Sequence, residues 1–186
     1  MRILAFVGYQ ASGKSEASKV ARSMGISVVM MGDVVREETE KRGLPQDDEH
    51  VGEVAKDLRA KEGMDAIAKR CVPRIEKISA SLVVVDGIRG SAEVERFRQV
   101  FGDKFILVSV ECPENIRYER MLGRKRSDAA PDEKFFKMRD ERENKFGLGD
   151  AMKMADVVIK NTGSIEDFRD RIKELLAVNQ KQRRGG

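Results

Sequence analysis

The sequence contains few of the residues that cross-link small secreted proteins or bind zinc. Its 186 residues include two cysteines, Cys71 and Cys112, which are far apart and form no C-x-x-C motif. This spacing argues against a disulfide scaffold and a zinc site, so we expect a cytoplasmic protein. No apolar run approaches the length of a membrane span, and the run at residues 3–7 is shorter than the core of a signal peptide. We therefore expect no membrane partner.

Aromatic residues and excess charge are also scarce. Aromatic side chains make up 5% of the chain, and the net charge is only +4 because 36 Lys and Arg nearly balance 32 Asp and Glu. Nonspecific binding of single-stranded nucleic acid relies on aromatic stacking beside a basic groove, so this composition argues against a nucleic-acid partner. The basic tail at residues 180–186 is predicted to be a frayed terminus. His50, the single histidine, lies in the polar stretch QDDEHV and is expected to be exposed rather than catalytic.

Five short apolar runs, bounded by turn residues, are spread along the chain. They comprise residues 3–7, 26–30, 82–85, 105–110 and 157–159. Because each run is continuous rather than alternating, it predicts a strand buried on both faces, as in a parallel sheet. Segments with helical spacing lie between the runs, and Ser164 and Asp167 form a capping-box pattern before the last of them. Alternating strands and helices in a chain of this length predict a single α/β domain.

Two stretches interrupt this alternation. Residues 33–80 separate the second and third predicted strands and have mostly helical spacing, which predicts a helical insert at the edge of the sheet. Residues 117–147 are rich in cations. Three of these are predicted to lie on a solvated helix face: Arg117, Lys125 and Lys145. Four others are candidates for binding phosphate, because phosphoryl transfer needs cations from several segments: Arg120, Arg124, Arg139 and Arg142.

The stretch VGYQASGKSE carries the clearest chemical signal. It ends the first predicted strand and begins the first predicted helix, which is the context in which G-x-x-x-x-G-K-[ST] forms a phosphate-binding loop. Loop N–H groups bind phosphate oxygens, the lysine reaches the β- and γ-phosphates of ATP, and the serine hydroxyl binds Mg²⁺. In an ordinary turn the glycines would only permit positive φ angles. The predicted ATP-binding residues are Gly8, Tyr9, Gln10, Ala11, Ser12, Gly13, Lys14 and Ser15.

The third predicted strand ends in VVVDGIRG. A carboxylate at the tip of a strand beside the P-loop strand is placed to hold a Mg²⁺ water, as the Walker B aspartate does. Asp86 is the candidate for this role, with Ser15 as the second metal-binding residue. An Asp-Gly pair after a strand also serves as a simple turn.

Two segments resemble the acceptor side of nucleoside monophosphate kinases. MGDVVREE resembles the T-G-D-x-x-R segment of adenylate kinases, which implies that Arg36 binds the acceptor phosphate. DGIR resembles their D-G-F-P-R segment, although it lacks the proline and one residue of spacing, and it implies the same role for Arg89. Asp33 is a candidate to accept the proton of an acceptor hydroxyl, or alternatively to cap the helix that follows it.

Other segments resemble the donor side of the same enzymes. ERMLGRKRSD resembles the E-R-x-x-G-R-R entry to the adenylate kinase lid, which implies that Arg120 and Arg124 lie near the donor phosphates. RDERENKFG then supplies Arg139 and Arg142 on the returning lid helix. ADVVIKNTGSIEDF resembles the A-D-x-V-I-x-N-x-G-S-x-E segment of dephospho-CoA kinases, whose loop touches the donor adenine. That resemblance implies an ATP contact for Asn161.

Nearly the whole chain is identified as a member of an archaeal family of P-loop proteins related to dephospho-CoA and adenylate kinases. The resemblance implies a nucleoside-monophosphate-kinase-like P-loop fold, with helices around a five-stranded parallel sheet ordered 2-3-1-4-5. It also implies an acceptor-binding insert within residues 33–80 and a lid within residues 122–146. Two departures from the kinase P-loop are Gln10-Ala11, where Pro-Gly or Ile-Gly is common, and Glu16 after the serine.

The expected activity is Mg²⁺-dependent transfer of the ATP γ-phosphate to a small nucleotide-like acceptor, either a nucleoside monophosphate or dephospho-CoA. The alternatives are an ATP-dependent switch protein and a nucleic-acid-associated ATPase. We expect a monomer or a homodimer. The residues expected in catalysis are Lys14, Asp33, Arg89, Arg124 and Arg139. Those expected to bind the acceptor are Asp33, Arg36, Arg89 and Arg142.

Overall fold

A computed structural model describes residues 1–123 and 133–181 of the chain. The predicted lid falls partly within residues 124–132, so Arg124 and Lys125 lie outside the described residues. The strands are β1 (Arg2–Val7), β2 (Ser27–Met30), β3 (Leu82–Asp86), β4 (Phe105–Glu111) and β5 (Val157–Lys160). The helices are α1 (Lys14–Ser23), α2 (Met31–Lys41), α3 (Asp48–Glu62), α4 (Ala66–Glu76), α5 (Ser91–Phe101), α6 (Glu114–Gly123), α7 (Glu133–Lys145), α8 (Leu148–Lys153) and α9 (Ile165–Lys181), with a short 3₁₀ turn, η1, at Gly102–Lys104.

The five strands form one parallel sheet in the order β2-β3-β1-β4-β5, which confirms the predicted order. Every predicted strand agrees with the observed one to within one residue at each end. Strand β1 is central and its last five residues are buried. A strand buried on both faces needs apolar side chains at every position, which is why the runs in the sequence are continuous.

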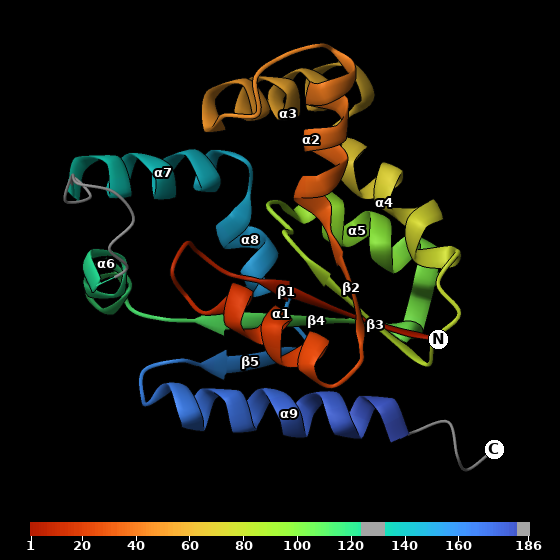
Figure 1. Cartoon of the computed structure of the whole chain (residues 1–186), viewed down its shortest axis with the longest axis vertical. Helices are drawn as coiled ribbons and strands as arrows, with labels where there is room; N and C mark the ends of the chain where they lie inside the picture. The colour runs from red at the N-terminus through yellow and green to blue at the C-terminus, as the bar shows by residue number, and fades with distance from the viewer. Residues whose placement is uncertain (124–132, 182–186) are drawn as a thin grey trace.

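Alternate residues of β1 face two separate cores. Ile3, Ala5 and Val7 pack with apolar residues of α2, α3, α4, α5 and α8. Leu4 and Phe6 pack with residues of α1 and α9 on the other face of the sheet. Figure 1 shows α9 running beside α1 along the sheet. Helices therefore cover both faces, and loops are left to build a site at the carboxyl ends of the strands.

The first residues of α9 and α2 are determined in different ways. The backbone N–H of Asp167 donates to Ser164 Oγ at 3.0 Å, which confirms the capping pattern before α9. Helix α2 instead begins at Met31, directly after β2, with Met30 as its N-cap. The alternative that Asp33 caps this helix is therefore wrong. Asp33 lies within the first turn, where its negative charge interacts favourably with the positive end of the helix dipole.

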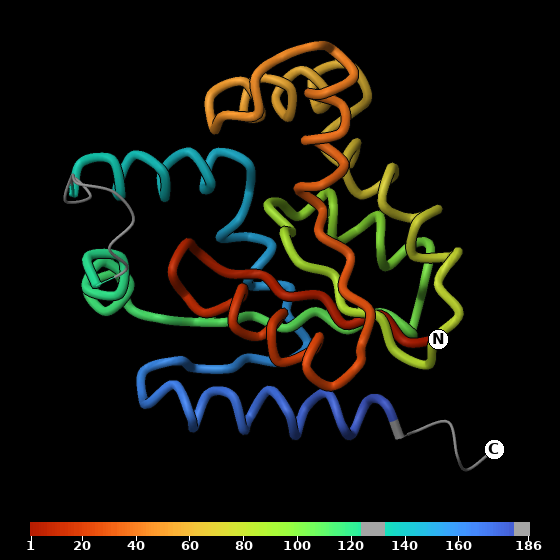
Figure 2. The backbone as a smooth tube through the Cα atoms, viewed as in Figure 1, coloured from red at the N-terminus to blue at the C-terminus, as the bar shows by residue number. Residues whose placement is uncertain are grey.

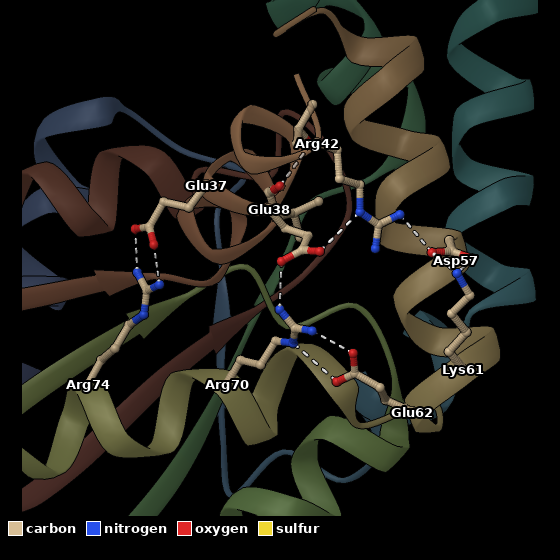
Figure 3. A network of polar contacts seen from close by, with 10 residues as sticks. Glu37, Glu38, Arg42, Asp57, Lys61, Glu62, Arg70 and Arg74 are labelled. Atoms are coloured by element: carbon tan, nitrogen blue, oxygen red, sulfur yellow. Dashed lines mark hydrogen bonds and ion pairs between the residues drawn. The ribbon is translucent and has the colours of Figure 1, made fainter. Parts of the chain in front are cut away.

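The helices of the 33–80 insert are tied together by ion pairs on their outer face (Figure 3). Arg70 of α4 bonds to Glu38 of α2 at 3.1 Å and to Glu62 of α3 at 2.5 Å. The pairs around it are Glu37–Arg74, Glu38–Arg42, Arg42–Asp57 and Asp57–Lys61. A network of this kind fixes the three helices relative to one another more firmly than isolated surface pairs would.

In Figure 2 the insert helices α2 and α3 lie on the opposite side of the molecule from α9, and α7 lies on the same side as the insert. Both cysteines are free, and Cys71 is buried within the first core. Within residues 1–123 and 133–181, no helix combines the length and apolar character that crossing a membrane requires.

Candidate active site

The loop between β1 and α1 has the geometry of a phosphate-binding loop. Gly13, immediately before α1, has a φ of +118°, and a Cβ added there would lie 2.4 Å from Asn161 Nδ2. A Cβ at Gly8 would lie 2.5 Å from the carbonyl oxygen of Val110. Side chains are thus excluded at both glycines of the motif. Ala11 adopts a φ of +58°, a conformation that costs a non-glycine residue about 1–2 kcal/mol and recurs at functional loops.

Lys14 is the first residue of α1, and its side chain folds back onto the loop that precedes the helix. Its ammonium donates to the carbonyl oxygens of Gly8 and, at 2.8 Å, of Tyr9. Burial lowers the pKa of Lys14 to about 8, and the nearby Arg89 guanidinium adds to this effect. The carboxylates of Asp86 and Glu143 partly oppose this lowering of the pKa. An ammonium held this way is placed to bind anionic oxygens.

Asp86 is the last residue of β3 and lies opposite Phe6 of β1 in the sheet register. Its carboxylate is buried, and its Oδ2 accepts a hydrogen bond from Ser18 Oγ of α1 at 2.7 Å. Ser15, the other predicted metal-binding residue, is exposed in the first turn of α1. The parallel pairing of β1 with β3 therefore brings the two motifs together, because carboxyl ends of adjacent parallel strands meet at one edge.

Asn161 and Arg120 support the loop from the side of β4 and β5. Asn161 Nδ2 donates to the carbonyl oxygen of Ser12 at 2.7 Å, and Arg120 donates to Asn161 Oδ1 at 3.2 Å. Arg120 also donates to Cys112 Sγ at 3.3 Å. Both polar atoms of the asparagine amide thus have protein partners. In the structure this side chain shapes the loop, which the resemblance to an adenine-contacting segment does not suggest.

Arg117 corrects a prediction from the sequence, because it is buried rather than solvated. Its guanidinium donates to Asp140 of α7 and to the carbonyl oxygen of Gln10 at 3.3 Å. It also lies over the rings of Tyr9 and Phe136, about 5 Å from each centroid. Helical spacing and composition could not reveal this, since the partners come from the loop and from a distant helix. Lys145, by contrast, is exposed as predicted.

A cavity of about 470 Å³ opens between the insert and α7. This volume is typical of a pocket for a small molecule. The cationic residues lining it are Arg36, Lys56, Arg59, Arg89, Arg139 and Arg142. The acidic ones are Asp48, Glu49, Glu53 and Glu143. The fold thus gathers four arginines that the sequence analysis singled out, from α2, the β3–α5 connection and α7, around one space.

Four residues of this region were missed by the sequence analysis as parts of a site: Arg59, Glu93, Glu143 and Phe146. Arg59 donates to Glu93 at 3.1 Å and stacks on the Phe146 ring, and both charged partners are buried. The backbone N–H of Arg89 donates to the other oxygen of Glu93 at 2.7 Å. Burial raises the pKa of Glu93, and Arg59 opposes that shift. No motif marks these residues, because Arg59 pairs with Glu93, 34 positions away, and stacks on Phe146, which is still farther along the chain.

Asp33 is not one of the described residues that line the cavity. Its side chain is about half exposed and pairs with Arg36 at 3.2 Å. Arg36 does line the cavity, as do Arg89, Arg139 and Arg142. His50 bonds to Asp47, the N-cap of α3, and this carboxylate raises the pKa of the imidazole.

The sequence of the chain is similar to that of known archaeal proteins. A UPF0200/UPF0201 protein of Archaeoglobus fulgidus is 56% identical over 178 residues, covering 95% of this chain. The chain belongs to the UPF0200 family. A UPF0200 protein of Methanosarcina acetivorans is 50% identical over 176 residues, covering 95% of this chain and 94% of that protein. The chain spans 55% of the length of the Archaeoglobus relative. A family model described as an AAA domain also matches residues 4–144.

The fold of this UPF0200 chain is similar to that of several solved kinase structures. A gluconokinase from Sinorhizobium meliloti 1021 superposes with a TM-score of 0.60 and 16% identity, covering 97% of this chain and 94% of that one. A shikimate kinase from Acinetobacter baumannii in complex with shikimate gives a TM-score of 0.58 and 17% identity, covering 97% and 96%. At these identities the likeness establishes the fold, which is that of a P-loop kinase. The expected archaeal, kinase-like family and fold are confirmed.

Proposed function

We propose that this UPF0200 protein is a Mg²⁺-dependent kinase that transfers the γ-phosphate of ATP to a small nucleotide-like acceptor. The observation that carries the proposal is the cavity lined by Arg36, Arg89, Arg139 and Arg142, because the charges of two of these arginines, Arg89 and Arg139, also act on Lys14 of the phosphate-binding loop. Phosphoryl transfer needs little covalent chemistry and depends on cations that hold and neutralise phosphate oxygens. A P-loop facing an arginine-lined pocket supplies that arrangement.

The residues present fit ATP and Mg²⁺. A phosphate cradle needs loop glycines without side chains, and the close approaches at Gly8 and Gly13 meet that need. Ser12 Oγ is buried in the loop with no hydrogen-bond partner among the described residues. Mg²⁺ usually takes one or two protein ligands and completes its shell with phosphate oxygens and water. Asp86 and Ser15 would hold it, and bound Mg²⁺ supplies charge neutralisation between the phosphates.

Each part of the fold then has a task. The insert within residues 33–80 binds the acceptor, with Arg36 and Arg89 on its anionic group. The segment within residues 122–146 acts as a lid that brings Arg139 to the transferred phosphate. Lys14 binds the β- and γ-phosphates, and Arg120 and Asn161 stabilise the loop on the donor side. The acceptor classes left open are nucleoside monophosphates and dephospho-CoA.

A coupled assay of ADP release tests this function. Purified protein is mixed with ATP, Mg²⁺ and, in turn, each nucleoside and deoxynucleoside monophosphate and dephospho-CoA. We expect at least one acceptor to raise ADP release well above the rate with ATP alone, and Lys14→Met to abolish the increase. The circular dichroism spectrum of the Lys14→Met variant should match that of the wild type, since Lys14 is not part of either core.

A second candidate function is a nucleotide-dependent switch, favoured by the contacts between the loop and α7. Gln10 Nε2 donates to the carbonyl oxygen of Phe136 at 3.0 Å, so the state of the loop is mechanically connected to the lid helix. Stoichiometric ATP binding without turnover for any acceptor would identify a switch and overturn the kinase.

A further inference from the structure

The cavity contains one buried carboxylate to which the proposed function gives no task. Glu143 of α7 lines the cavity and is 4% exposed. Its Oε1 accepts a hydrogen bond from Arg89 and lies 3.7 Å from Arg139 Nε. Its Oε2 is also buried, yet no described residue donates to it. Buried acceptor atoms are nearly always satisfied, so an unsatisfied one in a pocket indicates that a ligand supplies the donor.

Glu143 also lies close to where the γ-phosphate would be bound. The charges of Arg89, Asp86, Glu143 and Arg139 all act on the Lys14 ammonium, which holds the β- and γ-phosphates in the proposed function. In the proposed function Arg139 reaches the transferred phosphate and Arg89 binds the anionic group of the acceptor, and both arginines contact Glu143. The carboxylate therefore belongs to the transfer centre rather than to the outer rim of the cavity.

We propose that Oε2 of Glu143 accepts the hydrogen bond of an attacking hydroxyl group, so that the acceptor is an alcohol carrying an anionic group. The inference rests on the proposed kinase function and deepens it. An attacking phosphate oxygen is anionic and is repelled by a carboxylate, whereas a hydroxyl donates to one. Asp33, the sequence-based candidate for this task, is half exposed and does not line the cavity. Arg36 and Arg142 remain available for the anionic group.

The transfer step balances with these groups. The acceptor oxygen forms a bond to the γ-phosphorus of ATP, and the bond from that phosphorus to the β–γ bridging oxygen breaks. The electron pair of the broken bond leaves with ADP, and the hydroxyl proton passes to Oε2 of Glu143. Arg89 from the β3–α5 connection and Arg139 from α7 contact the carboxylate, and its charge acts on Lys14 of α1. These cations compensate the charge that develops on the transferred group.

The first test identifies the product made by the wild-type protein. ATP and Mg²⁺ are supplied with dephospho-CoA or with each nucleoside monophosphate, and the products are examined by ³¹P NMR. We expect a new phosphate monoester. A product with a new diphosphate linkage would overturn the role of Glu143 and leave the kinase function standing. Absence of any phosphorylated product, with ATP bound, would overturn both.

The second test replaces the carboxylate itself and follows the acceptor that turns over. We expect Glu143→Gln to lower kcat at least 100-fold, within the range of general base catalysis. The KM for the acceptor should change less than threefold, and Glu143→Asp should recover at least tenfold of kcat. Glu141→Gln, an exposed position on the same helix, is the matched control and should behave as wild type.

A purely structural role for Glu143 predicts a different pattern. Glutamine would then disturb Arg89 and Arg139 and raise the KM for the acceptor more than it lowers kcat. That result, or a kcat of Glu143→Gln within fivefold of wild type, overturns the proposal. Thermal unfolding of each variant establishes that it is folded before kinetics are compared. If Glu143→Gln does not fold, the ³¹P product analysis of the wild type decides.

Discussion

Arg117 and Asp140 form a two-point ion pair beside the phosphate-binding loop, with nitrogen–oxygen distances of 2.6 and 3.2 Å. Their side chains are only 5% and 14% exposed. Because Arg117 also donates to the carbonyl oxygen of Gln10, one guanidinium joins α6, α7 and the loop. The pair therefore couples the shape of the phosphate site to the position of the helix that carries Arg139.

Removing one partner of this pair should be costly. We expect Arg117→Ala to lower the free energy of unfolding by about 3–5 kcal/mol, because it leaves the largely buried Asp140 carboxylate without a charged partner among the described residues and with only the 3.4 Å hydrogen bond from Gln10 Nε2. ATP affinity should fall as well, since the backbone carbonyl oxygen of Gln10 loses the hydrogen bond that Arg117 donates to it. Urea unfolding and binding of a fluorescent ATP analogue measure the two effects. Lys137→Ala, which breaks the exposed pair with Glu133, is the control and should cost at most about 1 kcal/mol. Equal effects of the two variants would contradict the coupling.

The lowered pKa of Lys14 predicts a pH dependence of ATP binding. The free protein loses the Lys14 proton as the pH rises through about 8, whereas phosphate oxygens bind the ammonium form. Affinity should therefore be constant below pH 7 and weaken above pH 8 by up to about tenfold per pH unit. Lys14→Met should bind weakly at every pH. Titration of the fluorescent ATP analogue between pH 6.5 and 9.5 measures this, and a flat wild-type profile would count against the assignment.

Asp86→Asn should lower the transfer rate mainly by weakening Mg²⁺ placement. Asparagine can still accept the hydrogen bond from Ser18, so the fold should be retained, but the ligand charge is lost. We expect the rate at low Mg²⁺ to fall at least about tenfold and to recover partly at high Mg²⁺. The measurement is a Mg²⁺ titration of ADP release. Identical Mg²⁺ dependence in both proteins would exclude this role.

Arg36→Ala should affect the acceptor and spare ATP. Loss of a charge-assisted contact to the anionic group should reduce kcat/KM for the acceptor at least about tenfold. ATP affinity measured without acceptor should change less than about twofold, a difference below 0.5 kcal/mol. Arg36→Lys should recover little, because an ammonium lacks the planar fork of the guanidinium. Lys41→Ala, exposed on the same helix, is the control. Weakened ATP binding in Arg36→Ala would move this part of the insert to the donor side.

The ion pairs around Arg70 predict a salt-sensitive insert. Arg70→Ala removes contacts to Glu38 and Glu62, so the thermal midpoint should fall at low ionic strength. The difference from wild type should shrink in 1 M NaCl, where the Debye length is about 3 Å. Scanning calorimetry at both salt concentrations measures this. A deficit that is the same in both buffers would assign the effect to packing of the arginine stem.

The local motifs were predictable because their chemistry is contained in contiguous residues. Continuous apolar runs identified all five strands, and the glycines and lysine of residues 8–15 identified the phosphate-binding loop. Arg36, Arg89, Arg139 and Arg142 could be nominated from short segments that resemble kinases, and the structure places all four on one cavity.

The tertiary structure alone decided which charges are buried and paired. Arg117 pairs with Asp140, 23 residues away, and Arg59 pairs with Glu93, 34 residues away. In the sequence these four residues look like ordinary charged residues on the exposed faces of helices. Helix α2 begins at Met31 because β2 continues into it without a loop, and this removed Asp33 from the cap position. The sequence does not distinguish Glu143 from the other charged residues of α7. Its carboxylate is buried because α7 packs against the β3–α5 connection, where Arg89 contacts it. Sequence specifies the chemistry of each group, but burial and pairing depend on contacts that form only when distant segments meet.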